Sequence, residues 1–211
     1  MRKFEYWFHF ASAVIGLFLS GQCLSSCEPP PGFVNPRRPD VAPLEELLSH
    51  TEERHIALPL ALVLQSANRP LRIDATKDLP GVSGTFRLSD GPYGSLGARR
   101  LVCLTDGSTS VEEVLLTASD EDSSRFRYVV WNHTNPKYRD VAYAVGEFVR
   151  TRPAPDRTKV SWTYRFALKD GLSAEEKSRF QKFFLEREFA EWMRTQMDRS
   201  PCDAEAVPAA K

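Results

Sequence analysis

The sequence predicts an α+β domain in which a curved antiparallel sheet packs against one long C-terminal helix. Five apolar runs between Arg99 and Leu168 are joined by short polar turns, with no helical pattern between them. A helical pattern follows from Ser173 to Arg199 and carries a stripe of aromatic residues. A stripe of this kind needs a large apolar face to cover it, and the preceding sheet is the segment able to supply one.

The helix is expected to begin at Ser173, whose hydroxyl can accept from a free backbone N–H, with Glu176 completing a capping box. The members of the stripe recur at steps of three and four residues, which places them on one side of a 3.6-residue helix. They are Phe180, Phe183, Phe184, Trp192, Met193 and Met197. Pro201 ends the pattern.

We expect strands at 100–105, 110–118, 126–131, 141–150 and 158–168. In the last of these, apolar and polar residues alternate, so the face that carries Trp162, Tyr164 and Phe166 is predicted to meet the helix.

The chain before these strands is harder to interpret. Residues 44–55 show a short helical pattern, and 56–64 form either an edge strand or a short helical segment, because Pro59 interrupts the run. Residues 79–97 contain turn-like clusters of glycine and proline and are expected to form a loop.

Residues 1–26 are expected to be a signal peptide. Arg2 and Lys3 precede an uncharged run from Trp7 to Leu19, which is too short for a comfortable membrane span. Residues 24–27 resemble a bacterial lipobox, in which Cys27 would become the lipid-carrying residue. An uncleaved anchor and an ordinary signal peptide are the alternatives. We therefore expect an exported protein on the periplasmic side, anchored to the membrane as a lipoprotein.

Residues 27–43 are expected to be a lipid-anchored, Pro-rich tether outside the fold, because 28–43 hold six of the 15 prolines. The folded domain would cover 44–200, and 201–211 would be a disordered tail. Cys103 and Cys202 remain once Cys27 carries lipid, and whether they pair stays open.

Composition excludes several classes of partner. Lys plus Arg and Asp plus Glu each number 28, so net charge gives no reason to expect nucleic acid. The sequence has no Cys/His cluster, GxSxG elbow or nucleotide-binding glycine motif. We expect no metal and no cofactor.

Five segments carry a resemblance to a known family: RRLVCLTDG (99–107), EEVL (112–115), FRYVVWN (126–132), YAVGEF (143–148) and TKVSWTYRF (158–166). With the final helix, the chain over about 98–198 resembles the START/polyketide cyclase-like superfamily (SRPBCC), whose fold is the helix-grip. The resemblance implies a cavity between sheet and helix that takes apolar or amphipathic small molecules.

Candidate residues for that cavity are mostly aromatic, with one carboxylate as a polar anchor. They are Trp131, Tyr143, Glu147, Trp162, Tyr164, Phe180, Phe184, Trp192 and Met193. Tyr164, Glu147 and Arg127 are the groups expected to orient a ligand. The alternative is that these side chains simply fill the core.

For catalysis, His133 is the best single candidate, because it follows a strand end and imidazole titrates near neutral pH. A solvent-exposed loop histidine is the alternative. Glu112 and Glu113 are expected on opposite faces of one strand, so they cannot act as a pair.

Three functions remain open at this point. The leading one is binding or transport of a small hydrophobic ligand or lipid. The first alternative is a cyclase or dehydratase type of enzyme in which His133 or a cavity glutamate moves a proton. The second is an interaction scaffold with a filled core and no ligand.

Overall fold

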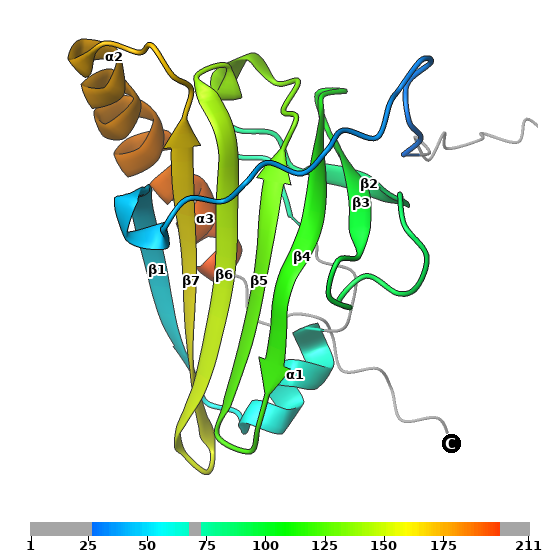
Figure 1. Ribbon diagram of the computed structural model, residues 1–211. Helices are drawn as coiled ribbons and strands as arrows, with labels where there is room; N and C mark the ends of the chain where they lie inside the picture. Colours follow the sequence, from blue (N-terminus) through cyan, green and yellow to red (C-terminus); the bar gives the residue numbers. More distant parts are fainter. Residues whose placement is uncertain (1–26, 68–72, 199–211) are drawn as a thin grey trace, which may run out of the picture.

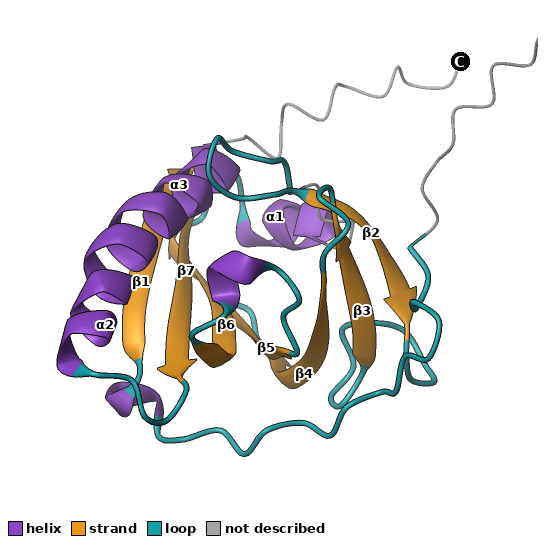
Figure 2. Ribbon diagram, turned by 90° about the horizontal axis from the view of Figure 1, so that it is seen from above, coloured by secondary structure: helices purple, strands orange, loops and turns teal. Residues whose placement is uncertain are grey.

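The computed structural model describes residues 27–67 and 73–198, and in this part of the chain one curved antiparallel sheet grips a long helix (Figure 1). The sheet has seven strands in the order β1-β7-β6-β5-β4-β3-β2. The elements are η1 (Leu44–Glu46), β1 (Leu48–Ile56), α1 (Leu60–Ala67), β2 (Val82–Arg87), β3 (Arg99–Leu104), β4 (Thr109–Ser119), β5 (Ser123–Trp131), η2 (Pro136–Tyr138), β6 (Val141–Ala154), β7 (Arg157–Leu168), α2 (Ala174–Arg179), η3 (Phe180–Phe189) and α3 (Ala190–Asp198). Figure 2 shows the helix lying against β1 and β7, inside the curve of the sheet. The predicted helix-grip fold is confirmed.

Strands β3 to β7 match the five predicted strands and form a meander of consecutive antiparallel pairs. The helical interpretation of 44–55 is wrong: η1 is followed by strand β1, which pairs along β7 from Leu48 opposite Phe166 to Ile56 opposite Thr158. The inward positions of β1 include His50 and Glu52, whose side chains bond each other at 2.8 Å. Because polar residues occupy inward positions of β1, the strand lacks the alternation of apolar and polar residues by which a strand is predicted from sequence.

Two other segments differ from expectation. Residues 56–64 contain the start of helix α1, so of the two predictions for this segment, an edge strand or a short helical segment, the helical one is correct. The expected loop over 79–97 contains strand β2, which forms the edge of the sheet beside β3.

The concave face of the sheet meets the helix through aromatic side chains. Trp162, Tyr164 and Phe166 face the helix as predicted, and all three are buried. The centroid of the Phe166 ring lies 4.9 Å from that of Phe189, and the Trp162 ring lies 5.5 Å from Trp192. Burial of rings of this size supplies a large share of a domain's hydrophobic stabilisation.

The C-terminal helix begins as predicted, with the full capping box between Ser173 and Glu176. Its middle section, η3, is a π-helix, in which backbone bonds close at i→i+5 and each turn is wider. The Ala190 N–H, for example, bonds the Leu185 carbonyl. The buried residues Phe180, Phe184 and Phe189 are therefore spaced four and five apart.

The convex face of the sheet is covered by residues 27–47, which we call the strap. The strap is extended, as predicted, but the expectation that 27–43 lies outside the fold is wrong. Figure 1 shows it crossing β4, β5 and β6 before it reaches η1. Phe33 and Val41 pack on a second apolar cluster on this face, and the Ala42 N–H donates to Tyr143 Oη at 2.8 Å.

A disulfide fastens the start of the strap to the sheet. Cys27 bonds Cys103 of β3, with a Cα–Cα distance of 5.6 Å. A Cβ on Gly84 would lie 2.9 Å from the Cβ of Cys27, so the glycine in β2 makes room for the bridge. Lipidation of Cys27 would use the same sulfur atom, so one molecule cannot carry both modifications. The predicted lipid attachment therefore conflicts with the structure, and Cys103 has Cys27, not Cys202, as its partner.

The predicted signal peptide at 1–26, the tail at 201–211 and Cys202 lie outside the described residues. Within the described residues, no helix combines the length and apolar character that crossing a membrane requires.

Candidate functional site

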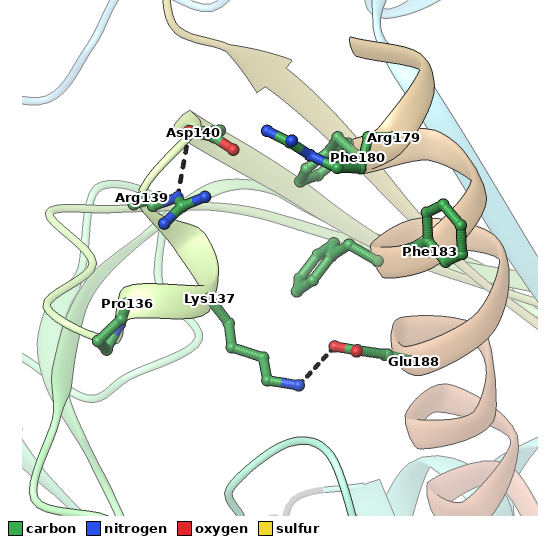
Figure 3. A pocket seen from close by; sticks show the side chains of 9 residues that line it. Pro136, Lys137, Arg139, Asp140, Arg179, Phe180, Phe183 and Glu188 are labelled. Carbon is green, nitrogen blue, oxygen red and sulfur yellow. Dashed lines mark hydrogen bonds and ion pairs between the residues drawn. The ribbon is translucent and has the colours of Figure 1, made fainter. Parts of the chain in front are cut away.

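An open pocket of about 310 Å³ lies at one end of the grip, between η2 and the middle section, η3, of the C-terminal helix (Figure 3). Pro136, Lys137, Arg139 and Asp140 line one side, and Arg179, Phe180, Phe183, Phe184 and Glu188 line the other. The volume is at the lower end of the range for small-molecule sites, roughly 300–1,000 Å³.

Phenylalanine rings form the apolar wall of this pocket. Phe180 and Phe184 are buried and stacked with centroids 4.9 Å apart, whereas Phe183 is 57% exposed. The sequence pattern placed Phe183 on the buried side of the helix, and the π-helical turn is the reason it is not there. An exposed phenylalanine beside two buried ones is an apolar surface without a protein partner in the described structure.

Charged groups surround the apolar wall. The Lys137 Nζ lies 2.7 Å from Glu188 Oε2, and the Arg139 Nε lies 3.7 Å from Asp140 Oδ1. Among the described residues, Arg179 has no ion pair. Three of the lining residues are cations and two are acids. Outside the lining, Asp78 lies 3.9 Å from Lys137, and the charges of Arg179 and Arg139 act on Glu176. An apolar wall with a cationic rim suits a molecule that has an apolar body and an anionic head.

Six predicted cavity residues lie together between the sheet and the helix, but they fill that space by packing on each other. Trp162, Tyr164, Phe180, Phe184, Trp192 and Met193 all belong to the concave core cluster and are at most 9% exposed. Of these, Phe180 and Phe184 also reach the pocket. The predicted cavity in the middle of the grip is thus occupied by the aromatic side chains themselves.

The other three predicted residues lie on the convex face, which corrects their assignment to the cavity. Ala144, Gly146 and Phe148 of β6 pair with Phe166, Tyr164 and Trp162 of β7, so these residues of β6 lie on the face that meets the helix. Tyr143 and Glu147 consequently lie on the convex face. Trp131 pairs with Tyr143 and lies on the convex face as well. Apolar residues occupy both faces of β6 because the strap covers the outer one, so the sequence could not show which face was inward.

A hydrogen-bonded network crosses the concave face. The Tyr128 hydroxyl donates to Tyr164 Oη at 2.9 Å and accepts from Trp162 Nε1 at 3.3 Å. Burial raises the pKa of both tyrosines, so their hydroxyls stay protonated at physiological pH. Near them, Glu112 accepts from Tyr93 and Arg100. Tyr164, expected to orient a ligand, is therefore already engaged in an internal network.

His133 follows β5, and its Nδ1 lies 2.9 Å from Ser110 Oγ. Its ring stacks on Tyr138 with centroids 4.7 Å apart, and Nε2 is buried without a hydrogen-bond partner. Burial lowers the pKa of His133 from its ordinary value of 6.5 to about 4, and the positive charge of Lys169 acts in the same direction. The imidazole is neutral at pH 7 and does not line the pocket. His133 therefore matches neither the predicted catalytic residue nor the alternative, a solvent-exposed loop histidine.

This depressed pKa predicts a pH-dependent stability. Between pH 6.5 and 4 the unfolded chain binds a proton at His133 that the folded chain does not, so folding loses stability as the pH falls through this window. The expected loss is up to about 3 kcal/mol. Urea unfolding at pH 7 and pH 4 should show a smaller loss for His133→Gln than for the unmodified protein. Equal losses for both proteins would contradict the burial of the imidazole.

Four features of the pocket were not predicted from the sequence: Lys137, Arg139, Arg179 and the exposed position of Phe183. The first two lie in the polar loop over 132–139, where no pattern singled them out. Arg179 precedes Phe180 and could have been noted as a cation beside the aromatic stripe. The π-helical turn that exposes Phe183 has no signal in a pattern built on a period of 3.6.

No group of three or more His, Cys, Asp or Glu side chains suited to a metal occurs among the described residues. The expectation of no metal remains a prediction for the chain as a whole.

The sequence matches no protein-family model. It also matches no curated protein. Solved structures do resemble it in fold. A hypothetical protein from Helicobacter pylori superposes with a TM-score of 0.51 at 12% identity, covering 78% of this chain and 96% of that one.

Two further structures have lower scores. A norcoclaurine synthase point mutant from Thalictrum, in complex with a transition-state analogue, has a TM-score of 0.49 at 13% identity and covers 75% of this chain and 96% of that one. A START superfamily protein from Mycobacterium smegmatis has a TM-score of 0.46 at 9% identity, with coverages of 71% and 93%. The sheet order and the long helix show a helix-grip fold, as the sequence resemblance predicted. At these identities the likeness extends to the fold alone.

Proposed function

We propose that this protein binds a small amphipathic molecule, with an apolar body and a carboxylate or similar anionic head, in the pocket between η2 and the C-terminal helix. The observation that carries the proposal is the lining of this pocket, in which the stacked Phe180 and Phe184 rings form an apolar wall, Phe183 is 57% exposed, and Arg179 has no ion pair in the described structure. The apolar body would cover Phe183, and the head would bind Arg179. A π-helical segment also occurs frequently at functional sites.

We favour binding over catalysis because His133, the candidate group for proton transfer, is not accessible from the pocket. His133 is neutral at pH 7, stacks on Tyr138 and does not line the pocket. The two acids of the pocket, Asp140 and Glu188, are each paired with a cation.

We also propose that the protein is exported and works outside the cytosol. The Cys27–Cys103 disulfide supports this proposal, because such bridges persist in oxidising compartments.

Calorimetric titration with decanoate tests the pocket. We expect saturable binding that Phe183→Ala weakens about tenfold, because covering the exposed ring stabilises the complex by roughly 1–2 kcal/mol. Arg179→Gln should weaken decanoate binding and leave decanol binding unchanged, because only the carboxylate needs the cation.

The matched control is Phe86→Ala, which removes another partly exposed phenylalanine, on edge strand β2. It should leave the affinity for decanoate unchanged. Absence of saturable binding, or equal losses in Phe183→Ala and Phe86→Ala, would contradict the proposal.

A further inference from the structure

A second charged site lies on the convex face of the sheet, on the opposite side from the aromatic core. Arg125, Arg127 and Arg165 all bond the carboxylate of Glu147, which is 4% exposed. Three positive charges meet one negative charge, so the cluster keeps two positive charges.

Strand register builds this cluster. Glu147 of β6 lies directly opposite Arg127 of β5. Arg125 is two residues from Arg127 on the same face, and Arg165 of β7 pairs with Val145, two residues from Glu147. Arg125 and Arg165 therefore reach the carboxylate diagonally from the two flanking strands, which is the reach expected for long side chains on neighbouring strands.

The carboxylate holds the arginines in fixed positions. Glu147 Oε1 accepts from Arg125 at 2.9 Å and from Arg127 at 2.8 and 3.1 Å, and Oε2 accepts from Arg165 at 3.2 Å. Burial alone would raise the pKa of Glu147, but the hydrogen bonds from Arg127 and Arg125 outweigh it and lower the pKa, so the group is ionised at neutral pH.

Each guanidinium has five N–H donors, and at most two of them on any one arginine bond Glu147. The arginine side chains remain accessible, at 49% for Arg125, 24% for Arg127 and 22% for Arg165. Among the described residues, Arg125, Arg127 and Arg165 form ion pairs with Glu147 alone, and two other acids of this face have partners elsewhere. Glu53 pairs with Lys159, and Glu113 pairs with Arg38 and Arg99.

We propose that Arg125, Arg127 and Arg165 form a binding site for a phosphate-type oxyanion, held in place by Glu147. Planar guanidinium groups can donate paired hydrogen bonds to phosphate oxygens. Because Glu147 already fixes the three arginine side chains, binding an anion costs less conformational entropy. The anion is either a free phosphate group or the headgroup of an anionic lipid. This site is separate from the proposed amphiphile pocket and does not depend on it.

The test is an NMR titration that follows the Nε–H signals of the arginines. Inorganic phosphate, or vesicles of phosphatidylglycerol, should shift the signals of Arg125, Arg127 and Arg165 in a saturable way. Arg125→Gln, the most exposed of the three, should weaken binding about fivefold. Arg165→Gln provides a second variant. Arg87→Gln is the control, because it makes the same charge change on exposed edge strand β2.

The two probes separate the sources of the anion. Shifts with phosphate alone support a soluble ligand, and shifts with phosphatidylglycerol vesicles but not with phosphatidylcholine vesicles support a lipid headgroup. The proposal is overturned if neither probe shifts these three signals, or if Arg87→Gln weakens binding as much as Arg125→Gln does while all variants keep the melting temperature of the unmodified protein.

Discussion

Replacing Gly146 with alanine is expected to destabilise the protein by about 3 kcal/mol or more, which is the upper range for overpacking a core. Gly146 of β6 lies opposite Tyr128 of β5, and the tyrosine ring covers the glycine on the concave face. An added Cβ would overlap the ring and lie 2.6 Å from its hydroxyl oxygen. The ring cannot move freely, because its hydroxyl is bonded to Tyr164 and Trp162.

Urea unfolding of a double-mutant cycle measures this effect. In a Tyr128→Leu background, Gly146→Ala should lower the free energy of unfolding much less, because the tyrosine ring that the added methyl group would meet is absent. If Gly146→Ala lowers the free energy of unfolding equally with and without Tyr128, a clash with the tyrosine ring is not the cause of the destabilisation. Loss of the fold in the single variant, with recovery in the double variant, would support the same conclusion.

Removing the disulfide between Cys27 and Cys103 is expected to cost about 4 kcal/mol by the chain-entropy relation for a loop of this length. The two cysteines are 76 residues apart, so the bridge restricts a large part of the unfolded chain. The variant Cys27→Ser/Cys103→Ser should show this loss in urea unfolding, and dithiothreitol should lower the stability of the unmodified protein but not that of the variant.

Cys202→Ser is the matched control and should leave stability unchanged. A loss of stability in Cys202→Ser, with none in Cys27→Ser, would contradict the observed pairing. Mass spectrometry of the protein from its own host adds a second check. Peptides joined through Cys27 and Cys103 are expected, and a lipid on Cys27 would contradict the bridge.

The parts of the fold that could be predicted are those in which one periodic face is apolar and the other is polar. Strand β7 has this pattern, so Trp162 was placed correctly against the helix. The start of the helix was also correct, because Ser173 and Glu176 form a local motif that does not depend on the rest of the chain.

The errors have a common physical cause, which is contact that a local pattern does not contain. The prolines of the strap indicated an extended segment, but its packing depends on apolar residues such as Phe33 meeting a sheet formed far along the chain. Burial of both faces of β6 removed the alternation that would have placed Glu147 on the convex side. Among the pocket residues, Phe180 and Phe184 were predicted, whereas Phe183 was misplaced by the change in helical period.

The most direct test of the central claim is an NMR titration of the protein, labelled with carbon-13 in its aromatic side chains, with decanoate. The account predicts saturable shifts at Phe180, Phe183 and Phe184, with little change at Tyr128 and Trp162, because the ligand covers the open pocket and leaves the filled interior intact. Largest shifts at Trp162 and Tyr128 would show that the ligand enters the middle of the grip and would contradict this account, as would the absence of any saturable shift.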